Sequence, residues 1–222
     1  MKYGYFKMED EILSQKKSIW KKLLPYFMTG MLTGITLIIM LYALKIYPFG
    51  DKAYLWADAD QYFGIESYFG SLLGKNDIFY SWGNVLGGNV LAELAYYSFS
   101  PFNVIFILFH DHMIFAAHFV AYIKIIVSAL TFCYCLLSTY DEKNILIKAT
   151  LSTCYAFMGY MVFYGWNTSW MDGVILLPLM YVGIRKLIHN KNIFLYVFSL
   201  AVAVISNFYI GFMLCIGSFI LY

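Results

Sequence analysis

Charged residues are scarce in this chain: they make up 13% of its 222 residues, while 62% are hydrophobic and 21% are aromatic. Soluble domains carry roughly 25% charged residues, so the polar side chains here are too few to cover a globular surface. A small-residue cleavage site is also lacking after the first apolar run, which excludes a removed signal peptide. Apolar runs of about 20 residues are instead typical of membrane spans. The sequence therefore predicts an integral membrane protein that retains its first apolar run as a signal anchor.

Cysteine is also rare, and the four residues Cys133, Cys135, Cys154 and Cys215 all fall inside apolar runs. Cys133 and Cys135 are two positions apart, which separates their side chains by about 200° around a helix. Two side chains so far apart cannot bind one metal ion together. Packing within the spans is therefore our interpretation for all four cysteines.

Apolar runs divide the rest of the chain into predicted membrane helices. They cover about Leu23–Ile46, Ile114–Leu137, Ala149–Trp166, Gly173–Ile188 and Ile193–Tyr222, and the last run is interrupted near residues 206–209. The predicted organisation is a basic arm (1–22), a first transmembrane helix (23–46), a long loop (47–113) and further transmembrane helices (114–222). Because no polar segment closes the last run, we expect the chain to be the N-terminal portion of a longer protein. The predicted fold is an all-α polytopic membrane protein.

Lysine and arginine indicate which loops face the cytoplasm, because basic residues accumulate on that side of a membrane. The arm at 1–22 has six lysines, and the loops at 139–148 and 185–191 have five more basic residues. Residues 47–113 contain only two lysines against seven acidic residues. This asymmetry predicts a cytoplasmic N-terminus and an outward-facing loop at 47–113. The segment "NTSWMD" (167–172) then also faces outward, so the two outer segments can meet.

Residues 58–74 of the outer loop predict an amphipathic helix that lies along the membrane surface. One predicted face holds Asp58, Tyr62, Ile65, Phe69, Leu72 and Leu73, and the other holds Asp60, Gly64, Ser67, Gly70, Ser71 and Gly74. The second face consists mostly of small residues, which permit another helix or a ligand to approach closely. We therefore expect this helix to be a packed part of the loop.

Two carboxylates, Asp58 and Asp60, form a D-x-D at the start of this predicted helix, among aromatic residues. Asp58 and Gln61 match a helix-capping arrangement, in which Asp58 accepts a backbone N–H and Gln61 reaches back. A cap needs only one carboxylate oxygen, so the other oxygen is still able to face a substrate. Capping and chemistry therefore both stay open for Asp58.

Other residues of the sequence admit two interpretations each. Trp82 and Tyr97 are either interfacial belt residues or stacking surfaces for a sugar ring or a polyprenyl chain. Lys124 lies inside the second predicted span without an evident partner, and ionisable groups at that depth usually have a function. The alternative interpretation is that Lys124 forms an ion pair with an acidic residue outside this sequence, or that the boundaries of the span differ from those predicted.

Several segments, taken in order, are similar to those of a known family. They are the basic arm with its first span, "DADQY" (58–62), "YSWGNVLGGN" (80–89), "YYSFSPFN" (96–103), "WMDGVILLPLMYVGIRKL" (170–187) and "SNFYIGFM" (206–213). In this order and spacing, the chain resembles the N-terminal part of the YfhO-type bacterial membrane proteins, which are placed with the GT-C glycosyltransferases. The resemblance implies GT-C-like transmembrane helices and a longer full-length protein.

The resemblance also implies a sugar transferase that uses a polyprenyl-phosphate-linked donor at the outer face of the cell membrane. Its acceptor would be a cell-envelope polymer such as lipoteichoic acid, and it implies contact with membrane lipid but with no nucleic acid. Such enzymes place an essential acidic residue in the first outer loop, where Asp58 and Asp60 stand. The alternatives are a transporter or flippase for lipid-linked sugars, with broken helices and intramembrane charges, and a non-catalytic membrane scaffold.

Sugar transfer from a lipid phosphate needs a base for the acceptor hydroxyl group and a cation for the departing phosphate. Asp58 is the expected base, and Asp60 orients it or holds a divalent cation, with both carboxylates as the expected metal ligands. The expected substrate contacts are Gln61, Tyr62, Trp82, Asn89, Tyr97, Trp170 and the third carboxylate, Asp172. Lys52 and Lys75 are the candidate cations of the loop.

Overall fold

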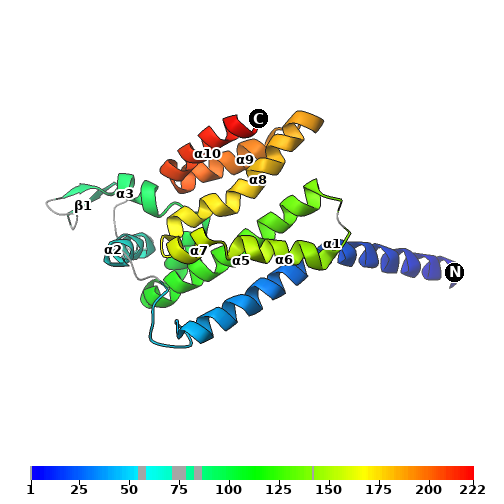
Figure 1. Cartoon of the computed structure of the whole chain (residues 1–222), viewed down its shortest axis with the longest axis horizontal. Helices are drawn as coiled ribbons and strands as arrows, with labels where there is room; N and C mark the ends of the chain where they lie inside the picture. Colours follow the sequence, from blue (N-terminus) through cyan, green and yellow to red (C-terminus); the bar gives the residue numbers. More distant parts are fainter. Residues whose placement is uncertain (1, 55–58, 72–78, 83–86, 142) are drawn as a thin grey trace.

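The computed structural model describes residues 2–54, 59–71, 79–82, 87–141 and 143–222, with the backbone alone described for 2–18, 59–63 and 190. These residues are mostly helical, and Figure 1 shows the order of the elements. The elements are α1 (Lys2–Leu44), α2 (Ala59–Gly70), β1 (Tyr80–Ser81), β2 (Gly88–Asn89), α3 (Val90–Tyr97), the 3-10 helix η2 (Pro101–Asn103), α4 (Val104–Leu108), the 3-10 helix η3 (His110–His112), α5 (Met113–Thr139), α6 (Ile145–Ala156), α7 (Gly159–Tyr164), α8 (Thr168–Asn190), α9 (Phe194–Ser206) and α10 (Phe208–Leu221).

Two helical stretches among the described residues, Ile19–Leu44 and His110–Thr139, are long and apolar enough to cross a membrane. A third candidate is the pair Val90–Tyr97 and Pro101–Leu108, which is bent by 106° and is either a broken span or a re-entrant loop. The prediction of a helical, polytopic membrane protein is confirmed. The short antiparallel pair β1–β2 is the one departure from an all-α fold in the described part of the chain.

The later apolar runs differ from the predicted spans. The run at about Ala149–Trp166 is divided, because α6 ends at Ala156 and α7 begins at Gly159. The run from Ile193 is divided at Asn207, where an interruption was predicted, into helices of 13 and 14 residues. At 1.5 Å per residue each is about 20 Å long, which is shorter than the roughly 30 Å hydrocarbon core of a bilayer.

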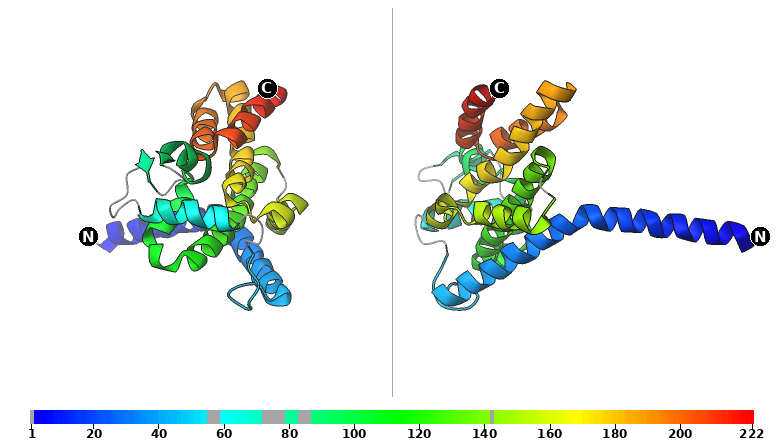
Figure 2. Two further views of the ribbon diagram at one scale, coloured as in Figure 1. Left: turned by 90° about the vertical axis from the view of Figure 1, so that its left-hand side faces the viewer. Right: turned by 45° about the vertical axis from the view of Figure 1, so that its right-hand side comes forward.

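Helices α9 and α10 form an antiparallel hairpin that packs on α8 (Figure 2). The hydroxyl groups of Tyr196, near the start of α9, and Ser218, near the end of α10, are 3.0 Å apart. A Cβ atom at Gly183 of α8 would lie 2.6 Å from the backbone nitrogen of Tyr196, so only glycine allows this approach of α8 and α9. Small residues at such crossings are typical of helix packing in membranes.

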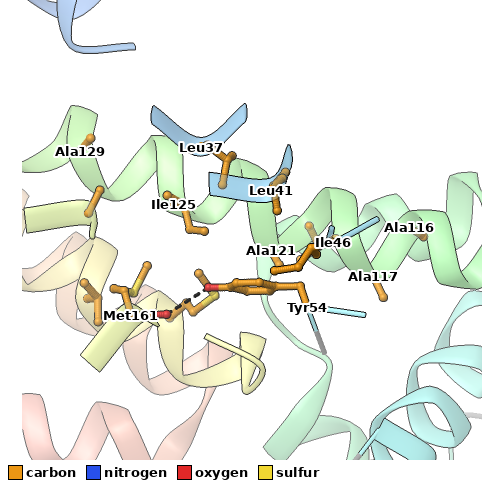
Figure 3. Close-up of a cluster of buried hydrophobic side chains, with 14 of the residues drawn as sticks. Leu37, Leu41, Ile46, Tyr54, Ala116, Ala117, Ala121, Ile125, Ala129 and Met161 are labelled. Atoms are coloured by element: carbon orange, nitrogen blue, oxygen red, sulfur yellow. Dashed lines mark hydrogen bonds between the residues drawn. The ribbon is translucent and has the colours of Figure 1, made fainter. Parts of the chain in front are cut away.

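Helix α5 is central in the bundle and contacts α1, α6 and α8. Its buried face is rich in small residues, including Ala116, Ala121 and Ala129, and the side chains of α1 pack on that face (Figure 3). Tyr54, which follows α1, is buried in the same core, and its hydroxyl group donates a hydrogen bond to the carbonyl oxygen of Met161 at 3.0 Å. The beginning of the outer loop is thereby attached to α7.

Helix α2 coincides with the predicted amphipathic helix of the outer loop, and it packs against α3 and α4. The close approach predicted for its small-residue face is found at Gly70, where a Cβ atom would lie 2.8 Å from the carbonyl oxygen of Phe106. Gly64 and Ser67 on the same predicted face are exposed. Figure 1 shows α2, β1 and α3 together beside the start of α8, at the opposite end of the molecule from the N-terminus.

Candidate functional site

A buried ion pair joins α5 to α8 near the outer loop. The Nζ atom of Lys124 lies 3.0 Å from Oδ1 of Asp172, and the two side chains are 0% and 5% exposed. The same ammonium group donates a hydrogen bond to the carbonyl oxygen of Thr168 at 2.9 Å. Thr168 and Asp172 are one turn apart and therefore lie on the same face of α8. One lysine thus contacts two successive turns of α8 and fixes it against α5.

This ion pair bears on the alternatives for Lys124. Its acidic partner is Asp172 of the same chain, 48 positions further on, rather than a residue outside this sequence. The ring of Phe102 covers the ammonium group, with a centroid 5.4 Å from Nζ. Lys124 is therefore enclosed by protein on every side that the structure describes, and no phosphate group has direct access to it.

Glu66 of α2 is a second buried carboxyl group at the same place. It is 3% exposed, and its Oε1 atom accepts a hydrogen bond from Nδ2 of Asn103 at 2.9 Å. The same nitrogen donates to the carbonyl oxygen of Ser98 at 3.2 Å. Asn103 thereby connects α2 to the segment between α3 and η2. We call Glu66, Asn103, Lys124 and Asp172 the polar cluster.

Electrostatics in the polar cluster are dominated by burial. Burial raises the pKa of Glu66 to about 8, with a further rise from the nearby Asp172, whereas Lys124 lowers it. The reason is that an apolar environment penalises the charged form of a carboxyl group. Glu66 is therefore mostly a neutral acid at pH 7, although it lies in a helix of the outer loop.

Three residues of the polar cluster have a buried polar atom without a hydrogen bond among the described residues. These atoms include Oε2 of Glu66, Oδ1 of Asn103 and Oδ2 of Asp172. Most buried polar atoms in proteins have a partner. The cluster therefore brings unusual polar groups together at one place, which makes it the candidate functional site.

The predicted site residues fall into separate places. Asp172 belongs to the polar cluster, and Trp170 lies two positions before it, with its ring 6.2 Å from that of Tyr209. Tyr97 packs edge-on against Tyr96, with ring centroids 4.5 Å apart, and its carbonyl oxygen is 3.5 Å from Nδ2 of Asn103. Asp172 thus lies in the polar cluster, and Tyr97 contacts the cluster through its backbone carbonyl group.

Asn89 is the last residue of β2, and Trp82 directly follows β1; Figure 1 shows β1 at its left edge. The Oδ1 atom of Asn89 accepts a hydrogen bond from the backbone N–H of Leu91 at 3.0 Å and caps α3. The Trp82 side chain is 80% exposed and packs edge-on against Tyr80. The structure thus gives Asn89 a structural role and leaves the ring of Trp82 free to meet a lipid or a ligand.

The D-x-D falls at the start of α2, and most of it lies outside the described residues. Asp58 precedes the described helix directly, and Asp60, Gln61 and Tyr62 are described by their backbone alone, in the first turn of α2. The predicted base, cap and cation ligands there stay predictions. Among the described side chains, no group of three or more His, Cys, Asp or Glu residues is placed to hold a metal ion.

Together these features define a class: a polytopic helical membrane protein in which helix α2 of the loop at 47–113 is held by Asn103 near a buried ion pair between α5 and α8. The family model described as bacterial membrane protein YfhO matches residues 30–222, and the chain belongs to this family. The resemblance predicted from the sequence motifs is therefore confirmed. Searches of the curated proteins and of the solved structures each found no match.

Proposed function

We propose that this membrane protein is a glycosyltransferase that moves a sugar from a polyprenyl-phosphate-linked donor to a cell-envelope polymer such as lipoteichoic acid. One observation carries the proposal: α2, which begins directly after Asp58 and carries Asp60 in its first turn, is held through Glu66 by Asn103 of η2, and Glu66 lies near the buried pair of Lys124 and Asp172. Membership of the YfhO family supports the same conclusion. A lipid-linked donor would meet such a helix where the membrane ends.

In the proposed reaction, Asp58 takes the proton of the acceptor hydroxyl group while that oxygen attacks the anomeric carbon, and the lipid phosphate leaves. Asp60 orients Asp58 or holds a cation. Asp172 is committed to Lys124, so we assign both of them to positioning α8 rather than to contact with the sugar. Trp170 lies in the first turn of α8 and keeps its role as a proposed substrate contact.

The phosphate group needs a basic partner other than Lys124, because that ammonium group is fully enclosed. Lys52 has an exposed side chain and precedes the buried Tyr54 by two residues. It therefore stands on a fixed part of the loop, a few residues before Asp58. We assign Lys52 as the candidate cation for the departing phosphate.

The proposal requires α2 to face outward, and cysteine labelling tests that orientation. With the four native cysteines replaced by serine, Trp82→Cys should react in intact cells with a reagent that does not cross membranes, and Lys143→Cys should not. Both native side chains are exposed, so access to reagent depends on the side of the membrane alone. Reaction at position 143 from outside would reverse the orientation and remove α2 from the outer face.

A genetic experiment tests the function. Cells that lack this gene should lose a sugar substituent from an envelope polymer, and the wild-type gene should restore it. The matched control is a gene in which Asp111, an exposed residue at the surface of η3, is changed to asparagine. Full decoration of every envelope polymer without the gene would refute the proposed activity.

A second function, transport of the lipid-linked sugar, is favoured by one observation. The bent pair Val90–Tyr97 and Pro101–Leu108 has the form of a discontinuous helix, which many transporters use at their binding sites. A transporter would move the donor lipid across the membrane and leave its sugar attached. A transferase would separate the sugar from the lipid, so the fate of that bond distinguishes the two.

A further inference from the structure

The polar cluster contains one cationic side chain and two carboxyl groups. Lys124 is already engaged by Asp172 and by the carbonyl oxygen of Thr168. The neutral amide of Asn103 provides the hydrogen bond to Glu66. A negative charge on Glu66 would therefore be buried close to that of Asp172 without a cation of its own, and such a charge is costly.

We propose that Glu66 fastens α2 to the spans only while its carboxyl group carries a proton, and that α2 leaves the bundle when this proton is lost. In the protonated form, Glu66 gains an O–H donor, and buried acceptors without a hydrogen bond lie in the same cluster, namely Oδ1 of Asn103 and Oδ2 of Asp172. In the deprotonated form, Oε1 still accepts the hydrogen bond from Nδ2 of Asn103, but Oε2 is a buried acceptor without a hydrogen bond among the described residues, and neither oxygen can donate. The effect on sugar transfer rests on the proposed function, whereas the attachment of α2 does not.

The direction of the pH dependence follows from the position of Glu66. Its pKa in the folded protein is about 8, above the 4.5 that is usual for this group, because burial penalises the charged carboxylate. The folded state with α2 attached therefore binds the proton more tightly than the detached or unfolded state. The stabilisation is complete below about pH 4.5 and is lost as the pH rises through about 8.

Few titratable groups surround Glu66 on the neighbouring elements. They are Lys124 on α5, Asp172 on α8, Glu93 on α3 and His110, whose Cβ atom lies beside Gly70. Of these four, Lys124 and Asp172 act on the Glu66 carboxyl group. His110 is exposed, and its Nε2 atom lies 3.2 Å from Oδ1 of Asp111.

Cysteine reactivity measures the attachment of α2 directly. Phe69 is a half-buried residue of α2 that packs against the core, whereas Ser67 is exposed on the same helix. In the full-length protein without native cysteines, we compare the reaction rates of Phe69→Cys and Ser67→Cys with an impermeant methanethiosulfonate reagent between pH 6 and 9.5. The ratio of the two rates cancels the pH dependence of the thiol itself.

With Glu66 present, the ratio should rise from pH 6 to about 8, by up to about tenfold for each pH unit, and level off above about pH 8, where the carboxyl group is ionised in both states. With Glu66→Gln, which keeps the shape and the acceptor for Asn103 but cannot ionise, the ratio should stay low throughout. Glu93→Gln, in the neighbouring helix α3, should behave like the wild-type protein.

Two results would overturn the inference: a ratio that stays flat with Glu66 present, or the same rise in Glu66→Gln. The pH dependence of the ratio with Glu66 present is measured without a substitution at position 66. This test can therefore be made even where Glu66→Gln does not fold. The expected labelling together with an absence of sugar transfer would support the attachment of α2 and contradict the proposed function instead.

Discussion

Lys124→Met should strongly destabilise the protein, by on the order of 3–5 kcal/mol. The substitution leaves Asp172 as a charged group that is 5% exposed and has lost its ion-pair partner, and it also removes the hydrogen bond to the carbonyl oxygen of Thr168. Thermal aggregation in detergent and the amount of protein in membranes measure the effect. We expect an earlier transition and little accumulated protein.

A second substitution shows whether the ion pair causes this loss. Lys124→Met combined with Asp172→Leu removes both charges and should recover most of the stability, because a buried ion pair contributes little compared with apolar residues of similar size. Lys186→Met is the matched control, since its ammonium group contacts only the Tyr134 hydroxyl and ring among the described residues and is half-buried. Equal stability of Lys124→Met and the wild-type protein would mean that the pair is not buried as described.

Asp58→Asn should lower sugar transfer on the order of a hundredfold or more while leaving the amount of protein in membranes nearly unchanged. An amide cannot accept the proton of the acceptor hydroxyl group, so the chemical step loses its base. Asparagine caps a helix about as well as aspartate, so α2 keeps its start at Ala59. Asp58→Ala, by contrast, should lose about 1 kcal/mol of stability as well as activity.

Asp60→Asn separates the two carboxylates of the D-x-D. With Asp60 as a group that orients the base or holds a cation, we expect a smaller loss of transfer than for Asp58→Asn. Normal transfer by Asp58→Asn together with a loss in Asp60→Asn would exchange their roles. Normal transfer by both variants would make the D-x-D structural and end the catalytic assignment.

Local features of the sequence predicted the helices of this protein well. The length of an apolar run is a property of neighbouring residues, so the helices that contain Leu23–Leu44 and Ile114–Leu137 could be located without a structure. The amphipathic pattern likewise located α2, and Pro101 marks the start of a helical turn as expected from its fixed backbone angle. The break in the run at 149–166 was not visible, because both halves are equally apolar.

The polar cluster could be predicted only in part. Lys124 was recognisable as an ionisable residue in an apolar run, and Asp172 as a candidate outward carboxylate. Their contact could not be predicted, because the two residues are 48 positions apart and lie on different helices. The sequence did not predict that Glu66 is buried, because the two faces of the helix at 58–74 were defined mainly by apolar and small side chains. Its spacing of four from Gly70, which lies against Phe106, is the signal that could have placed it on the buried face.

The sequence predicted Asn89 as a substrate contact, although its position also fits a helix cap. Asparagine before a run such as "VLAELAYY" is a preferred helix cap, and the structure uses it in this way. A cap satisfies a local backbone group, whereas a substrate contact depends on a pocket built from distant segments. Helix capping is therefore the better-supported role of Asn89, and Asn89 is a weaker candidate for substrate contact than Trp170.

Transfer of a labelled sugar in isolated membranes tests the central claim most directly. The donor is a polyprenyl phosphate that carries a radioactive sugar, and the acceptor is the envelope polymer from cells that lack the gene. Membranes that contain the wild-type protein should release the label from the lipid and incorporate it into the polymer, while membranes with Asp58→Asn should leave it on the lipid. The account would be contradicted if the label stayed on the lipid with the wild-type protein present, whether or not that lipid changed sides of the membrane.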